Sequence, residues 1–448
     1  MLTLSRGIIS WWGDETILNT GTDEHGLKIY QKAFDFGQSP QKYVDAYVEK
    51  FRVLKEVLGL TDDLNFIRTT DVHHVKAAQE FWRQCNTNGY IYKKRYKAKY
   101  CVGCELERTD SEIENGHCFL HPNLELVILE EENYFFKFSK FQGPLLELYK
   151  TNPDFVIPDY RFNEIKSFVK EGLEDFSVSR LKDKMPWGVP VPGDDKHVMY
   201  VWFDALVSYI SAIGWPDDLN KFKTWWPVTQ YCGKDNLRQQ SAMWQAMLMS
   251  VGLPPSKHII IDGFVTSAGK KMSKSLGNVI NPLDIVREYG TEALRYFVIR
   301  ELHPYEDSDF TMERFKDAYN ANLANGIGNL ASRIMKMAST HLSGAPEIPE
   351  NTIPKDFLKA CGSFNLQDAS NIVWKYIGQL DSKIQETEPF KLIKTDKTEA
   401  VKIIEELVVG LYTVGRMLNP LLPQTSLAIK TAVKDNKMFD KPLFPRKD

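Results

Sequence analysis

The chain has 448 residues, of which 43% are hydrophobic and 26% are charged, a composition typical of folded globular proteins. Its length predicts roughly two or three domains and at least one sizeable core. The net charge of −3 excludes a surface coated uniformly in positive charge, although large enzymes also bind RNA through local basic patches.

The sequence does not indicate membrane insertion or secretion. No apolar run approaches the ~20 residues that span a bilayer, and the first residues lack the apolar core and cleavage site of a signal peptide. Six cysteines in a chain of this length do not form a disulfide scaffold. We expect Cys85, Cys232 and Cys361 to be inert thiols, and the protein to be cytoplasmic with no membrane partner.

The first predicted elements are a short strand, a turn and a helix start within residues 16–36. The turn Gly21–Gly26 contains Asp23, Glu24 and His25. Turns at the carboxyl edge of a parallel sheet face the ligand crevice, so Asp23 could hold a substrate ammonium group. A helix cap is an equally good explanation of the same turn.

Residues 39–59 predict an amphipathic helix. Ser39 and Pro40 form a typical start, and Gly59 ends the pattern. Five apolar side chains recur at helical spacing: Tyr43, Tyr47, Phe51, Leu54 and Leu58. This stripe predicts packing against a core rather than a cofactor site.

Residues 91–150 resemble a small inserted module with short strands. Its predicted metal ligands, in the spacing C-x2-C-x13-C-x2-H, are Cys101, Cys104, Cys118 and His121. Two such knuckles favour a closed, structural zinc site, for which His117 is a less regular alternative ligand. The preceding basic run, Lys93–Tyr100, could contact a phosphate backbone, or it could form a solvated strand face.

Strands and helices alternate from about Phe155 to Phe264, which predicts an α/β domain with a parallel sheet. The segment Tyr200–Tyr209 is predicted to be an aromatic strand that leads into a helix. Its Trp202 and Tyr209 could wall a pocket suited to a methionine thioether, or the strand could simply be buried.

Two further segments predict contacts to a nucleotide. Gly233 and Asp235 lie in a turn that opens the predicted helix 237–251, where a ribose or phosphate could bind. Lys271–Asn278, KMSKSLGN, carries two lysines among small residues and could follow a phosphate through a reaction. Such strings are often only solvated loops. The chain contains no G-x-x-x-x-G-K-[ST] loop and no G-x-G-x-x-G fingerprint, so the common ATPase and dehydrogenase readings lose support.

The rest of the chain predicts helices. Asn281 and Pro282 begin a capped helix that ends near Gly290. From about Phe315 onwards, apolar residues recur at helical spacing between short loops. This pattern predicts a C-terminal α-helical bundle.

Taken in this order, these segments resemble the methionyl-tRNA synthetase family of class I aminoacyl-tRNA synthetases. Lys271–Asn278 resembles the KMSKS signature of that class. The resemblance implies a Rossmann-type catalytic domain with a zinc-knuckle insertion and an anticodon-binding bundle. It implies ligation of L-methionine to tRNA(Met) with ATP and Mg2+, one structural Zn2+ and a monomeric protein.

The resemblance also assigns residues to roles. Asp23 would bind the methionine amine, while Trp202, Tyr209 and Gln240 would line its side-chain pocket. The implied ATP-binding and catalytic residues are Gly233, Asp235, Arg180, Lys271 and Lys274. The implied anticodon-binding residues are Asn325, Asn329, Arg333 and Phe390, since splayed bases are read by hydrogen bonds and by stacking.

The resemblance divides the chain into five regions: residues 1–90 and 155–264 (catalytic domain), 91–154 (insertion), 265–318 (KMSKS loop and stem contacts) and 319–448 (anticodon bundle). Phe390 stands where many relatives have Trp, and Gln240 where they often have His. We therefore expect a weaker stacking surface at Phe390, and weaker selectivity for methionine at Gln240.

The family's first strand and its HIGH signature do not occur in these 448 residues. We therefore expect weak methionine-dependent pyrophosphate exchange from this chain, because each lost transition-state contact commonly costs hundreds-fold. The alternatives are a catalytically inactive tRNA-binding relative and another class I synthetase, such as a cysteine or leucine enzyme.

Overall fold

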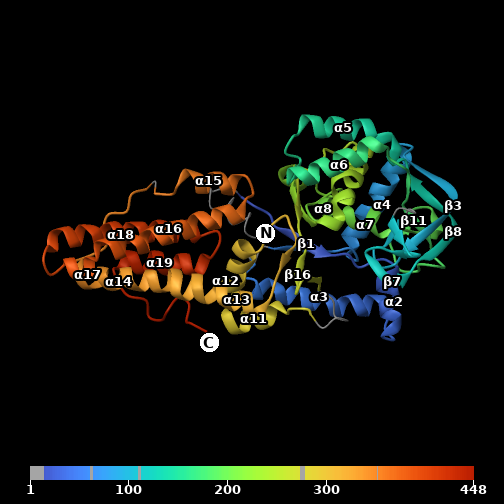
Figure 1. Cartoon of the computed structure of the whole chain (residues 1–448). Helices are drawn as coiled ribbons and strands as arrows, with labels where there is room; N and C mark the ends of the chain where they lie inside the picture. The colour runs from blue at the N-terminus through green and yellow to red at the C-terminus, as the bar shows by residue number, and fades with distance from the viewer. Residues whose placement is uncertain (1–14, 61–63, 109–111, 273–277, 351, 448) are drawn as a thin grey trace. The chain divides into compact units, whose positions relative to one another are not determined.

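The computed structural model describes residues 15–60, 64–108, 112–272, 278–350 and 352–447 (Figure 1). These residues form two compact units. The α/β unit is Ile17–Val53 with Thr61–Ile261, and the helical unit includes Leu54–Leu60 and Asp262–Asp448. The five regions predicted from the sequence stay a prediction.

The α/β unit contains short parallel sheets covered by helices. Strand β1 (Asn19–Thr22) pairs in parallel with β2 (Asn65–Arg68). A second sheet has the order β14 (Thr229–Gly233), β15 (His258–Asp262), β9 (Val156–Ile157), with β15 and β9 parallel. The predicted α/β class is therefore confirmed, although β1 begins at Asn19 and not near Thr16.

Helices pack on these strands through a core rich in aromatic rings. The ring of Phe81 on α4 (Val72–Thr87) lies 5.9 Å from that of Phe203 and 5.7 Å from that of Trp244. All three side chains are fully buried. The other helices of this unit are α2 (Leu27–Asp35), α5 (Gln142–Thr151), α6 (Asp159–Glu171), α7 (Val201–Leu206), α8 (Ser208–Ser211), α9 (Leu219–Trp225) and α10 (Trp244–Ser250), and α3 (Pro40–Val57) belongs to it as far as Val53.

Two sequence-based expectations are wrong in this unit. Strand β13 (Asp194–Met199) ends before Trp202, which lies on helix α7 and not on a strand. Helix α3 forms as predicted, but only part of its apolar stripe is buried, because Phe51 is 50% exposed while Tyr43 is 7% exposed.

The inserted module is an antiparallel sheet with a small metal-binding tip. Strand β3 (Ile91–Cys101) pairs along its length with β8 (Val127–Phe136), and β4 (Leu106–Arg108) and β10 (Phe176–Ser177) complete the sheet. The register places Arg95 opposite Glu132 and Lys97 opposite Glu130. The charged groups of Lys97 and Glu130 lie 3.5 Å apart. Acidic residues thus offset the basic run, which favours the solvated-face interpretation.

The tip and the neighbouring sheet complete the strands of this unit. They comprise β5 (Ile113–Glu114), β6 (His117–Cys118), β7 (His121–Glu125), β11 (Ser179–Leu181) and β12 (Pro190–Val191). In the neighbouring sheet β13 lies between β11 and β12.

The helical unit confirms the predicted C-terminal bundle. Its long helices are α14 (Asn329–His341), α16 (Leu366–Thr387), α18 (Lys397–Leu418) and α19 (Pro423–Asp435), which share one apolar core (Figure 1). Shorter elements are α11 (Pro282–Tyr289), α12 (Thr291–Tyr296), α13 (Met312–Ala318), α15 (Lys355–Gly362), α17 (Pro389–Leu392) and strands β16 (Val265–Ser267), β17 (Lys270–Lys271) and β18 (Ser308–Asp309). Helix α11 starts as predicted, with the Asn281 side chain accepting from the Leu283 amide at 3.1 Å. Among the described residues, no helix combines the length and apolarity required to cross a membrane.

Candidate functional site

The turn after β1 presents the carboxylate of Asp23. Asp23 is exposed to solvent, and within the described part of the chain its side chain makes no hydrogen bond or ion pair. The protein around Asp23 partly desolvates its carboxylate, and this desolvation, together with the charge of Asp204, raises the pKa of Asp23 to about 6. Helix α2 is capped by Gly26, without a side-chain hydrogen bond. The helix-cap interpretation of Asp23 is therefore not supported.

The neighbouring carboxylate, Glu24, fixes this turn to the sheet. Its side chain is 2% exposed and accepts from Arg68 Nε at 2.7 Å and Nη2 at 3.0 Å. The hydroxyls of Thr22 and Thr70 also donate to it. A buried carboxylate with this many donors holds the turn rigidly, and with it the position of Asp23.

We expect Glu24→Gln to lower the free energy of unfolding by roughly 3 kcal/mol, since Arg68 would lose its buried counter-charge. Asp45→Asn is the matched control, because Asp45 also accepts from Arg68, at 2.6 Å, but is half-exposed. Its loss should cost less than about 1 kcal/mol. Urea unfolding at pH 7 measures both, and equal losses would contradict the rigid-turn argument.

The side chains predicted to form a methionine pocket lie beside this turn. Trp202 on α7 is half-buried, and its indole Nε1 is buried without an acceptor among the residues the structure describes. The Tyr209 hydroxyl accepts a 2.8 Å hydrogen bond from Gln240 Nε2. Burial raises the pKa of Tyr209, and the charges of Cys232 and Asp23 add to this effect. Tyr209 therefore lies close to both the β1 turn and the end of β14.

Hydrogen bonds also join four buried polar side chains in this unit, those of His25, Asp204, His74 and Ser211. Asp204 on α7 is fully buried, and its two oxygens accept from His25 Nδ1 at 2.8 Å and His74 Nε2 at 2.9 Å. His74 Nδ1 in turn lies 2.9 Å from Ser211 Oγ. The His25 ring packs against Trp187, whose Nε1 donates to the Glu24 carbonyl at 2.6 Å.

The predicted nucleotide contacts have different surroundings. Gly233 ends β14, and the exposed Asp235 lies in the 3-10 turn that follows. Arg180 is buried, donates to Ser177 Oγ at 2.7 Å and lies over the Tyr200 ring at 4.6 Å.

The lysine loop is only partly described. Residues 270–271 form strand β17, which pairs with β16, whereas Lys274 lies outside the described residues. The predicted roles of Lys271 and Lys274 therefore stay predictions.

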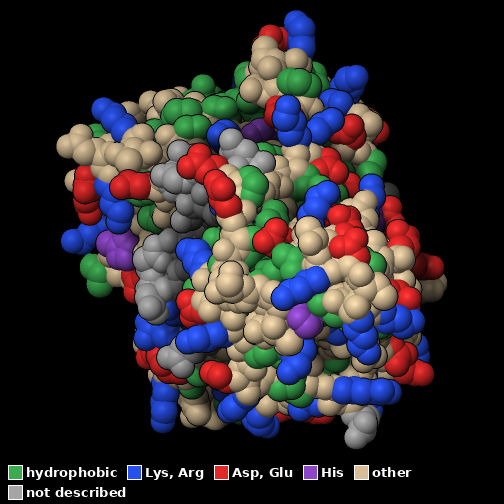
Figure 2. All heavy atoms as spheres, turned by 90° about the vertical axis from the view of Figure 1, so that its left-hand side faces the viewer, with side chains coloured by type: hydrophobic (Ala, Val, Ile, Leu, Met, Phe, Trp, Pro, Cys, Tyr) green, Lys and Arg blue, Asp and Glu red, His purple; other side chains and the backbone are tan. Residues whose placement is uncertain are grey.

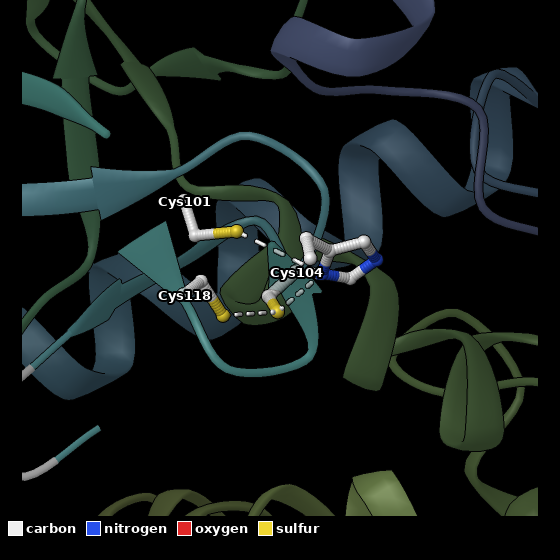
Figure 3. Close-up of side chains that lie close together, drawn as sticks. Cys101, Cys104 and Cys118 are labelled. Carbon is white, nitrogen blue, oxygen red and sulfur yellow. Dashed lines mark hydrogen bonds between the residues drawn. The ribbon is translucent and has the colours of Figure 1, made fainter. Parts of the chain in front are cut away.

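The four predicted metal ligands converge at the tip of the inserted module, and Figure 3 shows how the side chains of Cys101, Cys104 and Cys118 lie there. Their ligand atoms lie within 4.8 Å of one another. Cys104 Sγ is 3.6 Å from Cys118 Sγ and 3.0 Å from His121 Nδ1. A zinc–sulfur bond of ≈2.3 Å places two sulfurs of a tetrahedron about 3.8 Å apart, so the group fits a tetrahedral ion.

The alternative ligand, His117, points elsewhere, because its Nδ1 lies 3.1 Å from the Leu124 carbonyl oxygen. The metal tip also contacts the start of helix α2 and the residue before helix α7. Glu105, which follows Cys104, accepts from the Lys28 amide at 3.3 Å, and its carbonyl accepts from the Tyr200 hydroxyl.

The predicted anticodon residues lie on an exposed face of the helical unit. Asn325 and Asn329 are exposed, and Arg333 follows one turn later on α14. Arg333 Nη1 donates to Asp381 Oδ1 at 2.6 Å, and Phe390 on α17 is 45% exposed. Figure 2 shows the side of the molecule that lies on the left in Figure 1, where lysine and arginine side chains lie across the surface with acidic side chains among them.

Comparison with known proteins identifies the family. The family model described as "tRNA synthetases class I (M)" matches residues 10–123 and 109–335. The chain belongs to this class I tRNA synthetase family. It is 39% identical to a methionine–tRNA ligase of Thermotoga maritima over 92% of this chain and 68% of the relative. It is 37% identical to that of a Nostoc species over 92% of this chain and 82% of the relative.

A solved structure of the same class I tRNA synthetase family has a closely similar fold. It is the Mycobacterium tuberculosis methionyl-tRNA synthetase in complex with methionyl-adenylate, with a TM-score of 0.89 and 30% identity. The match covers 99% of this chain and 95% of that one. The fold class expected from the sequence is thus confirmed over nearly the whole chain.

Sequence reasoning missed the buried chain of Asp204, His74 and Ser211 in this family member. Asp204 lies within the aromatic segment Tyr200–Tyr209, but the sequence predicted no role for it. The sequence predicted no role for His74 or Ser211 either. A charged residue among the apolar neighbours of Tyr200–Tyr209 was the available signal, because buried carboxylates require partners.

Proposed function

We propose that this chain is a methionine–tRNA ligase, which activates L-methionine with ATP to methionyl-adenylate and transfers it to tRNA(Met). Family membership at 39% identity carries this conclusion. It is supported by the Asp23 carboxylate, which makes no hydrogen bond or ion pair to the residues that the structure describes and lies close enough to Tyr209 to raise the pKa of that side chain.

In this proposal the two halves of the amino-acid site recognise different parts of methionine. The Asp23 carboxylate binds the ammonium group, to which it offers an uncompensated negative charge. Trp202 and Tyr209 wall the side chain, since thioether sulfur packs favourably against aromatic rings. Gln240 holds the Tyr209 hydroxyl through the 2.8 Å hydrogen bond.

ATP binds, in the same proposal, with its ribose at Gly233 and Asp235. Lys271 and Lys274 stabilise the charge that builds on the phosphate oxygens, which is the main catalytic requirement of nucleotidyl transfer. Mg2+ accompanies ATP. Arg180 is buried and hydrogen-bonded, so we propose that it acts by holding the Tyr200 segment and by its positive field.

For tRNA(Met), we propose that Asn325, Asn329 and Arg333 hydrogen-bond the anticodon and that Phe390 stacks on a base. The Cys/His group holds one structural Zn2+, whose chemistry here is to fix the tip of the module. We further propose that the protein is a cytoplasmic monomer.

Titration of the full chain with L-methionine and L-norleucine tests the amino-acid site. Norleucine replaces the sulfur by a methylene group, so the chain should bind methionine more tightly. Tyr209→Phe removes the hydrogen bond that Gln240 donates to the Tyr209 hydroxyl, and the loss of this one hydrogen bond in the pocket wall should weaken methionine binding about tenfold. The control Tyr160→Phe, at an exposed position, should bind as the unchanged chain does.

Equal affinity of the unchanged chain for both amino acids would overturn the proposed substrate. Methionine-dependent pyrophosphate exchange and tRNA(Met) charging distinguish a ligase from an inactive tRNA-binding relative. The expected weak exchange of the 448-residue chain stays a prediction that the same assay measures.

A further inference from the structure

The two halves of the proposed methionine site come from distant parts of the sequence, and one residue connects them. The turn that carries Asp23 also carries His25, and helix α7 carries both Trp202 and Asp204. His25 and Asp204 are 179 residues apart in the chain, yet their side chains meet at 2.8 Å.

The side chains that connect the two halves are buried. Asp204 and His74 have no exposed surface, and His25 is 6% exposed. A carboxylate only accepts hydrogen bonds, so His25 Nδ1 and His74 Nε2 must both carry hydrogen. The other ring nitrogen of His74, Nδ1, lies 2.9 Å from the Ser211 hydroxyl oxygen, which completes the series of hydrogen bonds.

We propose that Asp204 is a positioning residue, which sets the separation between the Asp23 carboxylate and the Trp202–Tyr209 wall through its hydrogen bonds to His25 and His74. This inference rests on the proposed methionine site. Asp204 would not contact the substrate. It fixes the turn relative to α7, so that methionine meets both halves of the site at once.

The charged groups around Asp204 are consistent with this positioning role. Burial disfavours the charged form of Asp204, but His25 and His74 outweigh this and lower its pKa below the ordinary value. The titratable groups that lie around Asp204 are Asp23, Glu24 and His25 from the turn and His74 from α4. Asp204 therefore stays ionised and keeps both hydrogen bonds at neutral pH.

The test compares L-methionine with 4-(methylthio)butanoate, its analogue without the amino group. The ratio of the two dissociation constants measures what the ammonium site adds to binding. In the unchanged chain we expect a ratio of about 100, since a charge-assisted contact is lost with the amine. In Asp204→Asn the ratio should fall to about 10 or less, because the two halves are no longer held at the matching separation.

Loss of stability alone would not produce this result, since a smaller folded fraction weakens both ligands equally and leaves the ratio unchanged. Asp194→Asn is the matched control. Asp194 accepts from Lys93, Tyr134 and His197, none of which lies on the turn or on α7. Its removal should leave the ratio within about twofold of the unchanged chain.

Two further variants test the hydrogen bond from His74 to Asp204. His74→Phe keeps an aromatic ring but removes this hydrogen bond, so it should also lower the ratio. His74→Gln, whose amide can donate to Asp204, should restore it. If either variant fails to fold, Ser211→Ala removes the outer hydrogen bond and should give a smaller shift in the same direction.

The outcomes distinguish the two proposals. If the unchanged chain binds both ligands equally, Asp23 does not bind the amine and the proposed site is wrong. If the unchanged chain prefers methionine and Asp204→Asn keeps that preference, the positioning role is overturned. A shift in Asp204→Asn with none in His74→Phe would assign the effect to the Asp204 charge and also overturn it.

Discussion

His121→Asn should release the metal ion and locally unfold the inserted module, whereas His117→Asn should do neither. His121 Nδ1 lies 3.0 Å from Cys104 Sγ within the four-ligand group, while His117 Nδ1 faces a backbone carbonyl. Metal binding contributes roughly 10–16 kcal/mol in small zinc modules. The loss of one of four ligands should therefore exceed the effect of any ordinary point substitution in this chain.

Metal content and hydrogen exchange measure this difference. The unchanged chain and His117→Asn should each contain about one zinc per chain, and His121→Asn close to none. Backbone amides of β5, β6 and β7 should lose protection only in His121→Asn or after treatment with a chelator. The contact of Glu105 with the Lys28 amide should also weaken, so methionine binding should fall severalfold. Equal zinc content in the two histidine variants would contradict the assignment.

The metal site illustrates what the sequence could predict. Its four ligands lie within 21 residues, in the spacing of two knuckles, so local geometry alone brings them together. The start of α11 at Asn281 was predictable for the same reason, because a cap and its helix are neighbours in the chain. The alternation of strands and helices likewise predicted the α/β class without any knowledge of pairing.

Features that depend on distant pairing were not predictable. Arg95 and Lys97 looked like a basic patch until the register placed Glu132 and Glu130 opposite them. The register between β3 and β8 could not be predicted from the sequence, because the irregular metal-binding tip separates these strands. The hydrogen bonds of Asp204 join residues 130 and 179 positions away, and no local pattern indicates such partners.

The prediction of a strand in the aromatic segment Tyr200–Tyr209 was wrong for a different reason. Val201, Trp202 and Phe203 have high strand propensity, yet they begin helix α7 after β13 ends at Met199. Propensity is a weak guide where tertiary packing decides. Here Val201, Phe203, Ala205 and Leu206 are buried. The helical conformation of this segment also places Asp204 within hydrogen-bond distance of His25 and His74.

Asp23→Asn should weaken L-methionine binding by about 30- to 150-fold, which corresponds to the roughly 2–3 kcal/mol lost when one partner of a charged hydrogen-bonded pair is removed. Asp35→Asn is the matched control, because Asp35 is exposed on the neighbouring helix α2. It should leave methionine affinity unchanged at pH 7.5 by calorimetric titration.

The pH dependence of binding separates the charge of Asp23 from its shape. The pKa of Asp23 is raised to about 6 in the free protein, so below pH 6 the group is protonated and the ammonium loses its counter-charge. Methionine affinity of the unchanged chain should therefore fall up to tenfold for each pH unit below 6, and in Asp23→Asn it should not. Near pH 6, binding should also release a proton, because the bound ammonium favours the carboxylate.

The same raised pKa links binding to stability. Between pH 3.8 and 6 the folded protein holds a proton on Asp23 that the unfolded chain has lost. Stability from this group therefore falls as the pH rises through that window, and above it the ionised Asp23 disfavours the folded state. Asp23→Asn should thus raise the melting temperature at pH 7.5 while it weakens methionine binding. A variant that lost both stability and affinity would indicate a structural role for Asp23, in place of a carboxylate held unpaired for a substrate.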